Sequence, residues 1–177
     1  MASAFSHIAV PLVLFAGFKS ATVNFRLLLL AAIGSVIPDL DVIAFLWGIS
    51  YESQWGHRGF THSLVFALCL AGLMALFYRK LDSSASAVFW LCFISVASHA
   101  FLDAMTNGGL GVALFWPFSS ERIFLPVRPI QVSPIGISGF FSEWGLRVIA
   151  SELIWIWFPA LVVGALGVVL RRLYTKK

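Results

Sequence analysis

Residues 27–47 read LLLLAAIGSVIPDLDVIAFLW, a run long and apolar enough to cross a bilayer as a helix. Pro38 has no N–H and leaves the carbonyl of Gly34 without its helical partner, which predicts a bend or break. Asp39 and Asp41 follow the break, and irregular backbone at this depth is tolerated only against protein or water. We interpret the two carboxylates as ligands for a hard cation. A helix cap after the kink is the alternative, and it explains one aspartate better than two.

The rest of the chain has the composition of an integral membrane protein. Of its 177 residues, 60% are hydrophobic and 11% are charged, and the mean hydropathy is +0.93. This pattern predicts one all-α membrane domain over 1–177 with about five transmembrane helices. No Lys or Arg precedes the first apolar stretch, so we interpret it as a real segment and not as a secretory signal. The predicted helices cover 1–18, 27–47, 61–78, 85–105 and 148–170.

The basic residues predict how these helices are oriented. A net charge of +4 and a pI near 9.4 would also suit a nucleic-acid partner, but the charges gather beside the predicted helices, so no such partner is expected. Eight of the twelve basic residues fall on one side, which the positive-inside rule makes cytoplasmic. The N-terminus is then outside, the C-terminus is cytoplasmic, and 106–147 form a long outer loop. The eight are Lys19, Arg26, Arg79, Lys80, Arg171, Arg172, Lys176 and Lys177.

Every histidine, and every carboxylate within the predicted helices, falls on the outer side of the bilayer midplane. Such groups are costly in a membrane unless they are paired, bound to a metal or facing water. Histidine and aspartate are common ligands of Zn²⁺ and Mn²⁺. The sequence therefore predicts one shared polar site. Its candidate metal ligands are His7, Asp39, Asp41, His62, His99 and Asp103, joined by His57 as a ligand or proton carrier and by Glu152 as an additional ligand.

The spacing within two segments supports a shared site. His99 and Asp103 are four residues apart, so on a helix they share one face. They can chelate one ion, or the aspartate can orient the imidazole. A hydrogen bond between them on the helix surface is the alternative.

The second segment is the run HRGFTHS at 57–63. Its arginine, Arg58, has the planar fork that binds phosphate or carboxylate, and Thr61 or Ser63 can cap the helix that follows. Histidines that only lie at the membrane interface are the alternative interpretation.

The outer loop 106–147 is rich in proline and glycine. It contains Phe115-Trp116-Pro117-Phe118, which is too apolar for an ordinary exposed loop. Two hypotheses remain open: a re-entrant or interfacial lid over the site, or an aromatic belt that anchors the protein at headgroup level.

In combination, these motifs resemble the YdjM-like family of membrane-bound metal-dependent hydrolases. The resemblance covers about the first 120 residues, and the last third matches less clearly. It implies hydrolysis assisted by a bound metal and names no substrate. The matching pieces are His7, Pro38-Asp39-Leu40-Asp41, His57-Arg58-Gly59 through Thr61-His62-Ser63, His99-x-x-x-Asp103-x-x-Thr106 with Gly108 or Gly109, and Trp116-Pro117-Phe118.

Our leading hypothesis is a hydrolase of a prokaryotic inner membrane that cleaves a phosphoester of a lipid or lipid-linked substrate at the outer, periplasmic face. Seven candidate ligands exceed the three or four of one catalytic zinc, which favours two ions over one, with Zn²⁺ or Mn²⁺ equally allowed. The remaining site residues are predicted for three roles. Arg58 and His57 act in catalysis, and Arg58, Arg122 and Arg128 bind anionic oxygens of the substrate. Thr61, Ser63 and Thr106 lie behind the metal ligands.

Two other functions compete with hydrolysis. A divalent-metal transporter or sensor would use the same residues without chemistry. No ionisable residue continues into the cytoplasmic halves of the first four predicted helices, which argues against an ion path. A structural protein whose polar cluster only packs helices together is the third hypothesis. The His-Glu-x-x-His and Gly-x-Ser-x-Gly motifs of other hydrolases are missing.

Overall fold

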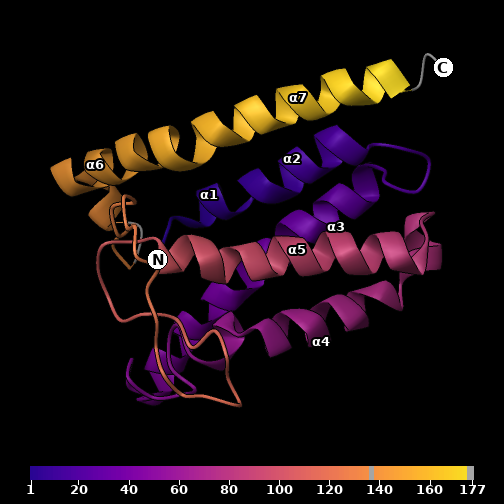
Figure 1. The fold of residues 1–177 in the computed structure, drawn as a ribbon. Helices are drawn as coiled ribbons and strands as arrows, with labels where there is room; N and C mark the ends of the chain where they lie inside the picture. Colours follow the sequence, from indigo (N-terminus) through magenta and orange to yellow (C-terminus); the bar gives the residue numbers. More distant parts are fainter. Residues whose placement is uncertain (136–137, 175–177) are drawn as a thin grey trace.

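Helices form all of the regular structure in the part of the chain described by this computed structural model, residues 1–135 and 138–174. They lie side by side, with the long segment between α5 and α6 at one end (Figure 1). The elements are α1 (Ala4–His7), α2 (Ala9–Phe18), α3 (Phe25–Val36), η1 (Ile37–Trp47), η2 (Phe60–His62), α4 (Leu64–Ala75), η3 (Tyr78–Leu81), α5 (Ala85–Ala104), η4 (Ser138–Phe141), α6 (Glu143–Glu152), η5 (Leu153–Trp157) and α7 (Phe158–Tyr174).

All five predicted apolar stretches become helical, but they differ in length. Three helical units are long and apolar enough to cross a membrane: Phe25–Trp47, Ala85–Ala104 and Glu143–Tyr174. Ala4–Phe18 and Leu64–Ala75 are apolar but shorter. The all-helical class is therefore confirmed, whereas the count of five spans stays a prediction.

The break predicted at Pro38 is present. The α-helix α3 ends at Val36, and the chain continues as the 3-10 helix η1, with Pro38 at its start. Because proline cannot donate the next helical hydrogen bond, the backbone changes its winding here. The change turns Asp39 into the protein and leaves Leu40 exposed.

Two serine caps move helix boundaries away from the predicted positions. The fifth helical stretch begins at Glu143 and not at residue 148, because the Ser142 hydroxyl accepts from the Gly145 N–H at 3.3 Å. The predicted loop 106–147 therefore includes the first turn of α6. Similarly, α4 starts at Leu64 because the Ser63 hydroxyl accepts from the Phe66 N–H at 3.0 Å.

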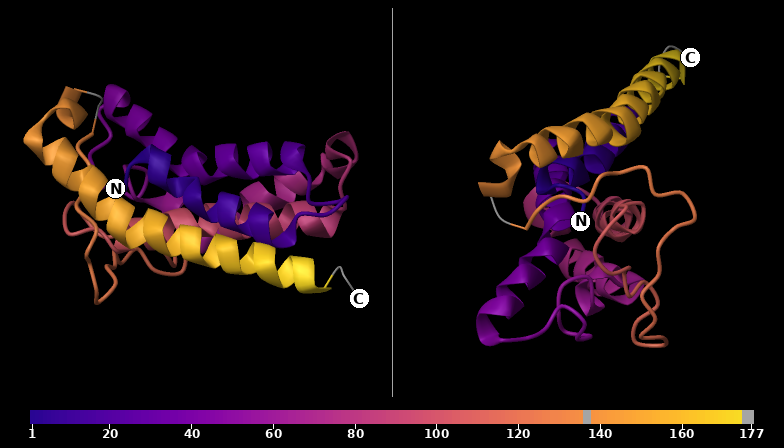
Figure 2. Two further views of the ribbon diagram at one scale, coloured as in Figure 1. Left: turned by 90° about the horizontal axis from the view of Figure 1, so that it is seen from above. Right: turned by 90° about the vertical axis from the view of Figure 1, so that its left-hand side faces the viewer.

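The core of the bundle lies around α5, which packs against α2, α3 and α4. The helix α7 packs along α2 and buries none of its own side chains (Figure 2). The protein is therefore most tightly packed between α3, α4 and α5. This largest core cluster consists of Val23, Leu27, Ala31, Ala71, Met74, Val88, Leu91 and Cys92.

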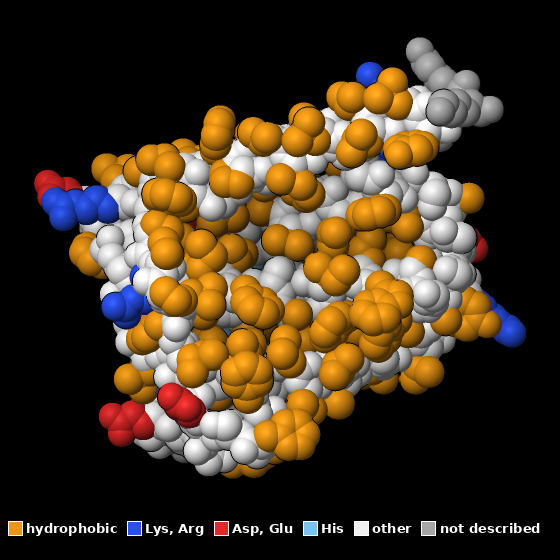
Figure 3. All heavy atoms as spheres, in the orientation of Figure 1, with side chains coloured by type: hydrophobic (Ala, Val, Ile, Leu, Met, Phe, Trp, Pro, Cys, Tyr) orange, Lys and Arg blue, Asp and Glu red, His pale blue; other side chains and the backbone are white. Residues whose placement is uncertain are grey.

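The two ends of the bundle differ in what they contain. The α2–α3 and α4–α5 connections lie at the same end as the C-terminal end of α7 (Figure 1). Six basic residues lie in or beside these three segments: Lys19, Arg26, Arg79, Lys80, Arg171 and Arg172. The opposite end, called the site end here, contains α1, η1, η2, the C-terminal end of α5 and the loop that follows it. Charged side chains gather at the two ends, and hydrophobic side chains cover the face between them (Figure 3).

Candidate metal centre

Two buried histidines face each other at the site end. The Nε2 atoms of His62 and His99 are 3.1 Å apart. Nδ1 of His99 donates to the Ser35 carbonyl oxygen at 2.7 Å, and Nδ1 of His62 lies 3.0 Å from the Thr61 hydroxyl. With each Nδ1 used as a donor, the network assigns a lone pair to each Nε2. Two facing lone pairs repel, and either a proton shared between the nitrogens or a metal ion bound to both removes this repulsion.

Two carboxylates complete the group around these nitrogens. Asp39 places Oδ1 3.3 Å from His99 Nε2, and Asp103 places Oδ2 3.4 Å from His62 Nε2. The four ligand atoms all lie within 4.8 Å of one another, and the four residues are buried. Tetrahedral zinc with ligand bonds of about 2 Å separates its ligand atoms by about 3.3 Å. The buried group thus has the residue types and the spacing to hold a divalent ion.

The local folding of three elements brings these residues together. Asp39 follows Pro38 in the first turn of η1, and His62 ends η2. His99 and Asp103 lie one turn apart on α5, as the spacing predicted. The nearby side chains of His7 and Asp39 have no hydrogen-bond partner at any of their four polar atoms. Because buried polar atoms are nearly always paired, these unpartnered atoms point to a bound ligand.

Asp41 lies behind His62 and not beside Asp39. Its Oδ1 accepts from His57 Nδ1 at 2.6 Å, and its Oδ2 accepts from the Thr61 hydroxyl at 2.6 Å. His62 Nδ1 lies 3.2 Å from the same Oδ2. A carboxylate in this position orients a ligating histidine and raises its basicity. Asp41, His57 and His62 also form a second group with metal-ligand spacing.

We predict that Asp41→Asn weakens metal binding without emptying the site. Loss of the carboxylate charge behind His62 should lower the affinity for a divalent ion by about 10- to 100-fold, the usual effect of such a partner. Zinc or manganese titration of the purified protein measures this. Asp82→Asn is the matched control, because Asp82 is exposed and pairs with Arg26 away from the site. An unchanged affinity in Asp41→Asn would show that this carboxylate does not support His62.

Arg58 does not face outward as a site for an anion, which corrects our expectation. Its side chain is fully buried, and Nε donates to Asp103 Oδ2 at 3.1 Å. The two terminal nitrogens donate to the Thr106 hydroxyl at 2.8 Å and to the carbonyls of Gly108 and Leu110 at 3.1 and 2.7 Å. Thr106 in turn donates to the Asp103 carbonyl at 2.7 Å. Arg58 therefore positions Asp103 and the start of the loop.

This packing requires a glycine at position 109. Gly109 has a φ of +77°, and a Cβ there would lie 2.7 Å from the Tyr51 hydroxyl and 3.2 Å from a terminal nitrogen of Arg58. We predict that Gly109→Ala destabilises the protein by about 1–3 kcal/mol, through the left-handed backbone and the displaced guanidinium. Thermal unfolding in detergent measures the change. Gly72→Ala is the control, because a Cβ at Gly72 meets nothing within 4 Å. Equal stability of the two variants would contradict the prediction.

Glu152, predicted as an additional ligand, is not brought to the four-residue group, and its carboxylate is occupied by partners near the N-terminus. Its carboxylate accepts from the Ser3 N–H at 2.5 Å, from the Ser3 hydroxyl at 2.6 Å and from the Ser6 hydroxyl at 2.8 Å. It therefore fixes the start of α1. Ala2 lies two residues before the start of α1, and its N–H donates to Asp103 Oδ1 at 2.6 Å. Side-chain patterns gave no signal for either of these contacts.

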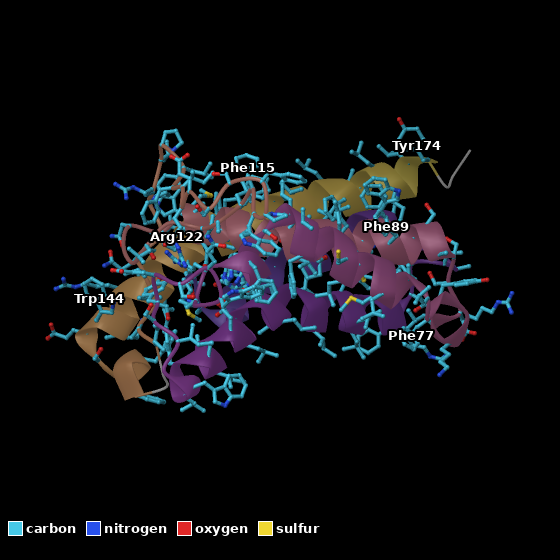
Figure 4. The ribbon with its side chains drawn as sticks, turned by 90° about the horizontal axis from the view of Figure 1, so that it is seen from below. Phe77, Phe89, Phe115, Arg122, Trp144 and Tyr174 are labelled. Atoms are coloured by element: carbon cyan, nitrogen blue, oxygen red, sulfur yellow. The ribbon has the colours of Figure 1, made fainter. Side chains whose placement is uncertain are left out.

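The two loop arginines have different surroundings. Arg122 donates to the His57 carbonyl at 2.8 Å and to the carbonyls of Tyr51 and Ser53 at 2.9 and 2.8 Å, so it holds the η1–η2 connection. Burial lowers the pKa of Arg122, which remains a cation at neutral pH. Arg128 is exposed and stacks on Phe124, and it is not brought to the buried group. Figure 4 shows Arg122 at the site end.

The loop after α5 has both of the features that we considered for it. It buries Val112, Leu114 and Ile130 at the site end, and Ala113 donates its N–H to the Arg58 carbonyl at 3.0 Å. Phe118, in contrast, is 89% exposed. The first feature suits a cover over the site and the second suits an anchor in the membrane interface, so both hypotheses stay open.

Comparison with known proteins gives three further findings. A family model described as "YdjM inner membrane protein" matches residues 1–175. Inner membrane protein YbcI of Escherichia coli (strain K12) is 40% identical over 164 residues, which cover 92% of this chain and 95% of that protein. Uncharacterized protein YvsG of Bacillus subtilis (strain 168) is 33% identical over 103 residues, 54% of this chain and 59% of that protein. No solved structure matches the chain.

Proposed function

We propose that this chain, which belongs to the YdjM family of inner membrane proteins, is a metal-dependent hydrolase with its active site in the buried His/Asp group. The observation that carries the proposal is the pair of buried Nε2 atoms 3.1 Å apart, with Asp39 and Asp103 oxygens 3.3 and 3.4 Å from them, in rings whose Nδ1 atoms contact other groups. Buried lone pairs in this arrangement are stabilised by a divalent cation. Asp39, His62, His99 and Asp103 would hold it.

The protein's own groups suit hydrolysis. A divalent ion held there would polarise a scissile phosphoryl or carbonyl group and lower the pKa of water. His57 is the proton carrier in this proposal: Asp41 fixes its Nδ1 at 2.6 Å, and its buried Nε2 has no hydrogen-bond partner. Arg58 holds Asp103 in place, while the cover formed by the α5–α6 loop limits access of bulk water.

The substrate that we propose is a phosphoester of a lipid or lipid-linked molecule. The site lies at one end of a protein whose helices expose large apolar side chains, so a substrate that is itself in the bilayer can reach it. Because Arg58 and Arg122 donate to protein acceptors, exposed Arg128 is the cation that we assign to an anionic headgroup.

The fuller topology belongs to the same proposal: five spans, with the N-terminus and the site on the periplasmic side of the inner membrane. The basic residues at the end opposite the site support this orientation. In a cysteine-free background, Ser120→Cys should react with an impermeant maleimide added to intact cells, and Lys80→Cys should not. Labelling of Lys80→Cys but not of Ser120→Cys would show the opposite topology.

Hydrolysis is tested with purified protein in lipid bilayers. Protein treated with chelator and then reloaded with Zn²⁺ or Mn²⁺ is mixed with phospholipid vesicles, and release of the headgroup phosphate is measured alongside release of fatty acid. Phosphate release that needs the ion and is lost in His62→Ala/His99→Ala supports the proposal. Fatty acid release alone would move the substrate class to carboxyl esters, and neither product would contradict hydrolysis of these lipids.

The same residues would also suit a transporter or sensor, but the burial pattern favours an enzyme. Among the described residues, the buried histidine, arginine, aspartate and glutamate side chains lie at the site end, and the core between α3, α4 and α5 contains none of these residue types. A path for an ion through the bundle is therefore missing from the described part of the chain. Proteoliposomes should show no uptake of Zn²⁺ or Mn²⁺ above that of empty vesicles, and clear uptake would favour transport.

A further inference from the structure

A single ion held by Asp39, His62, His99 and Asp103 would have four protein ligands. Structural zinc sites have four protein ligands, whereas catalytic sites have three and keep one position open for water or substrate. The four-residue group alone therefore resembles a site that stabilises a fold more than one that performs hydrolysis. Hydrolysis needs an ion with an open position.

His7 provides the feature that this group lacks. Its side chain is fully buried in α1, and neither ring nitrogen has a hydrogen-bond partner. The ring stacks on His99 with a centroid distance of 3.6 Å and an interplanar angle of 15°. Its Nε2 lies 3.8 Å from Asp39 Oδ2 and 3.6 Å from Asp103 Oδ1. These distances are too long for hydrogen bonds but near the spacing of atoms that share one ion.

Each of the two aspartates divides its oxygens between the histidines. Asp39 directs Oδ1 towards His99 and Oδ2 towards His7, at 3.3 and 3.8 Å. Asp103 directs Oδ2 towards His62 and Oδ1 towards His7, at 3.4 and 3.6 Å. The Ala2 N–H also bonds to this Oδ1, which has a second lone pair for a metal. Two carboxylates in this arrangement are suited to bridge two ions.

We propose that the site holds two divalent ions, bridged by Asp39 and Asp103. His62 and His99 complete the first position. The second has only three protein ligands, His7 Nε2, Asp39 Oδ2 and Asp103 Oδ1, and it is the position open to water and substrate. Paired ions of this kind are typical of enzymes that hydrolyse phosphoesters. This inference rests on the metal-binding part of the proposed function.

Metal content and spectroscopy test this inference without an activity assay. In wild-type protein loaded with Zn²⁺ and freed of excess metal, we expect about two ions per chain, and in His7→Ala about one. Ser98→Ala is the control, because Ser98 lies beside His99 on α5 and its hydroxyl donates to the Ser95 carbonyl at 2.8 Å within the helix, so it offers no ligand to the site. Its metal content should equal that of the wild type. One ion in the wild type, or two in His7→Ala, would overturn the inference.

A second measurement on the wild type covers the case in which His7→Ala fails to fold. Two Mn²⁺ ions bridged by carboxylates are spin-coupled, so the electron paramagnetic resonance spectrum at saturation should show a coupled pair, and an isolated Mn²⁺ signal alone would contradict the inference. The results of these metal measurements can be distinguished from a failure of the proposed hydrolysis. Two coupled ions without hydrolysis would support this site and reject the activity, and hydrolysis with a single ion would do the opposite.

Discussion

Replacing His62 and His99 together by alanine should remove the ion that these two residues hold and most of the stability that bound metal provides. A ligand that binds only the folded state stabilises it by about 2.7 kcal/mol at a concentration one hundred times its dissociation constant. The wild type should therefore unfold at a clearly higher temperature in Zn²⁺ or Mn²⁺ than in chelator. In the double variant, which lacks both facing Nε2 atoms, this difference should shrink to the part that His7, Asp39 and Asp103 can provide without them.

The comparison between metal and chelator separates loss of metal from damage to the fold. Each variant is measured in both conditions, so a general loss of packing lowers both unfolding temperatures and leaves their difference unchanged. Ser95→Ala is the matched control, because Ser95 is buried one turn before His99 on α5 and its hydroxyl donates to the Leu91 carbonyl. It should keep the full metal-dependent shift. An undiminished shift in His62→Ala/His99→Ala would show that the stabilising ion does not bind at His62 and His99.

The sequence predicted the members of the site better than their arrangement. Spacing alone placed His99 and Asp103 on one helical face, and Pro38 correctly marked where the helix changes. The sequence did not show that Asp39 faces the buried group while Asp41 lies behind His62. Residues two apart point in different directions in a 3-10 helix, where each residue turns by about 120°, so the pair could not both face one ion. The sequence predicted a bend or break at Pro38, and only the structure shows the 3-10 winding that follows it.

Other contacts depend on distant backbone that no local pattern contains. The imidazole of His99 is fixed by the Ser35 carbonyl, and Glu152 is occupied by Ser3 and Ser6 from the other end of the chain. A main-chain acceptor can be contributed by any residue type, and partners far apart in the sequence form no local pattern. Neither kind of contact can therefore be recognised from the sequence. For Glu152, the sequence contained no sign that its carboxylate accepts hydrogen bonds from Ser3 and Ser6.

Arg58 is the residue whose role changed most between sequence and structure. The HRGFTHS run suggested that Arg58 binds an anionic group of the substrate, because its planar fork suits phosphate or carboxylate. The backbone instead takes a φ of +63° at Arg58, which turns the side chain inward to Asp103. A left-handed conformation at a non-glycine residue is strained, and it persists only where surrounding contacts hold it. Here the acceptors from Asp103 to Leu110 hold it.

Removal of this guanidinium should therefore be severely destabilising. In Arg58→Ala, Asp103 loses its partner inside the protein, and the carbonyls of Gly108 and Leu110 lose their donors. Breaking a buried pair on one side costs about 3–5 kcal/mol. Arg58→Lys should not restore the loss, because a single ammonium cannot reach acceptors that are spread around a planar fork. Thermal unfolding in detergent measures both variants.

Metal should partly offset the Arg58→Ala defect, which distinguishes this explanation from a simple loss of packing. A divalent ion beside Asp103 supplies positive charge to the same carboxylate, so the loss of stability should be larger in chelator than in Zn²⁺ or Mn²⁺. Arg26→Ala is the control, because Arg26 pairs with Asp82 in an exposed bridge whose loss costs at most about 1 kcal/mol. A defect of equal size with and without metal would mean that Arg58 only fills space, and that Asp103 does not share its charge with an ion.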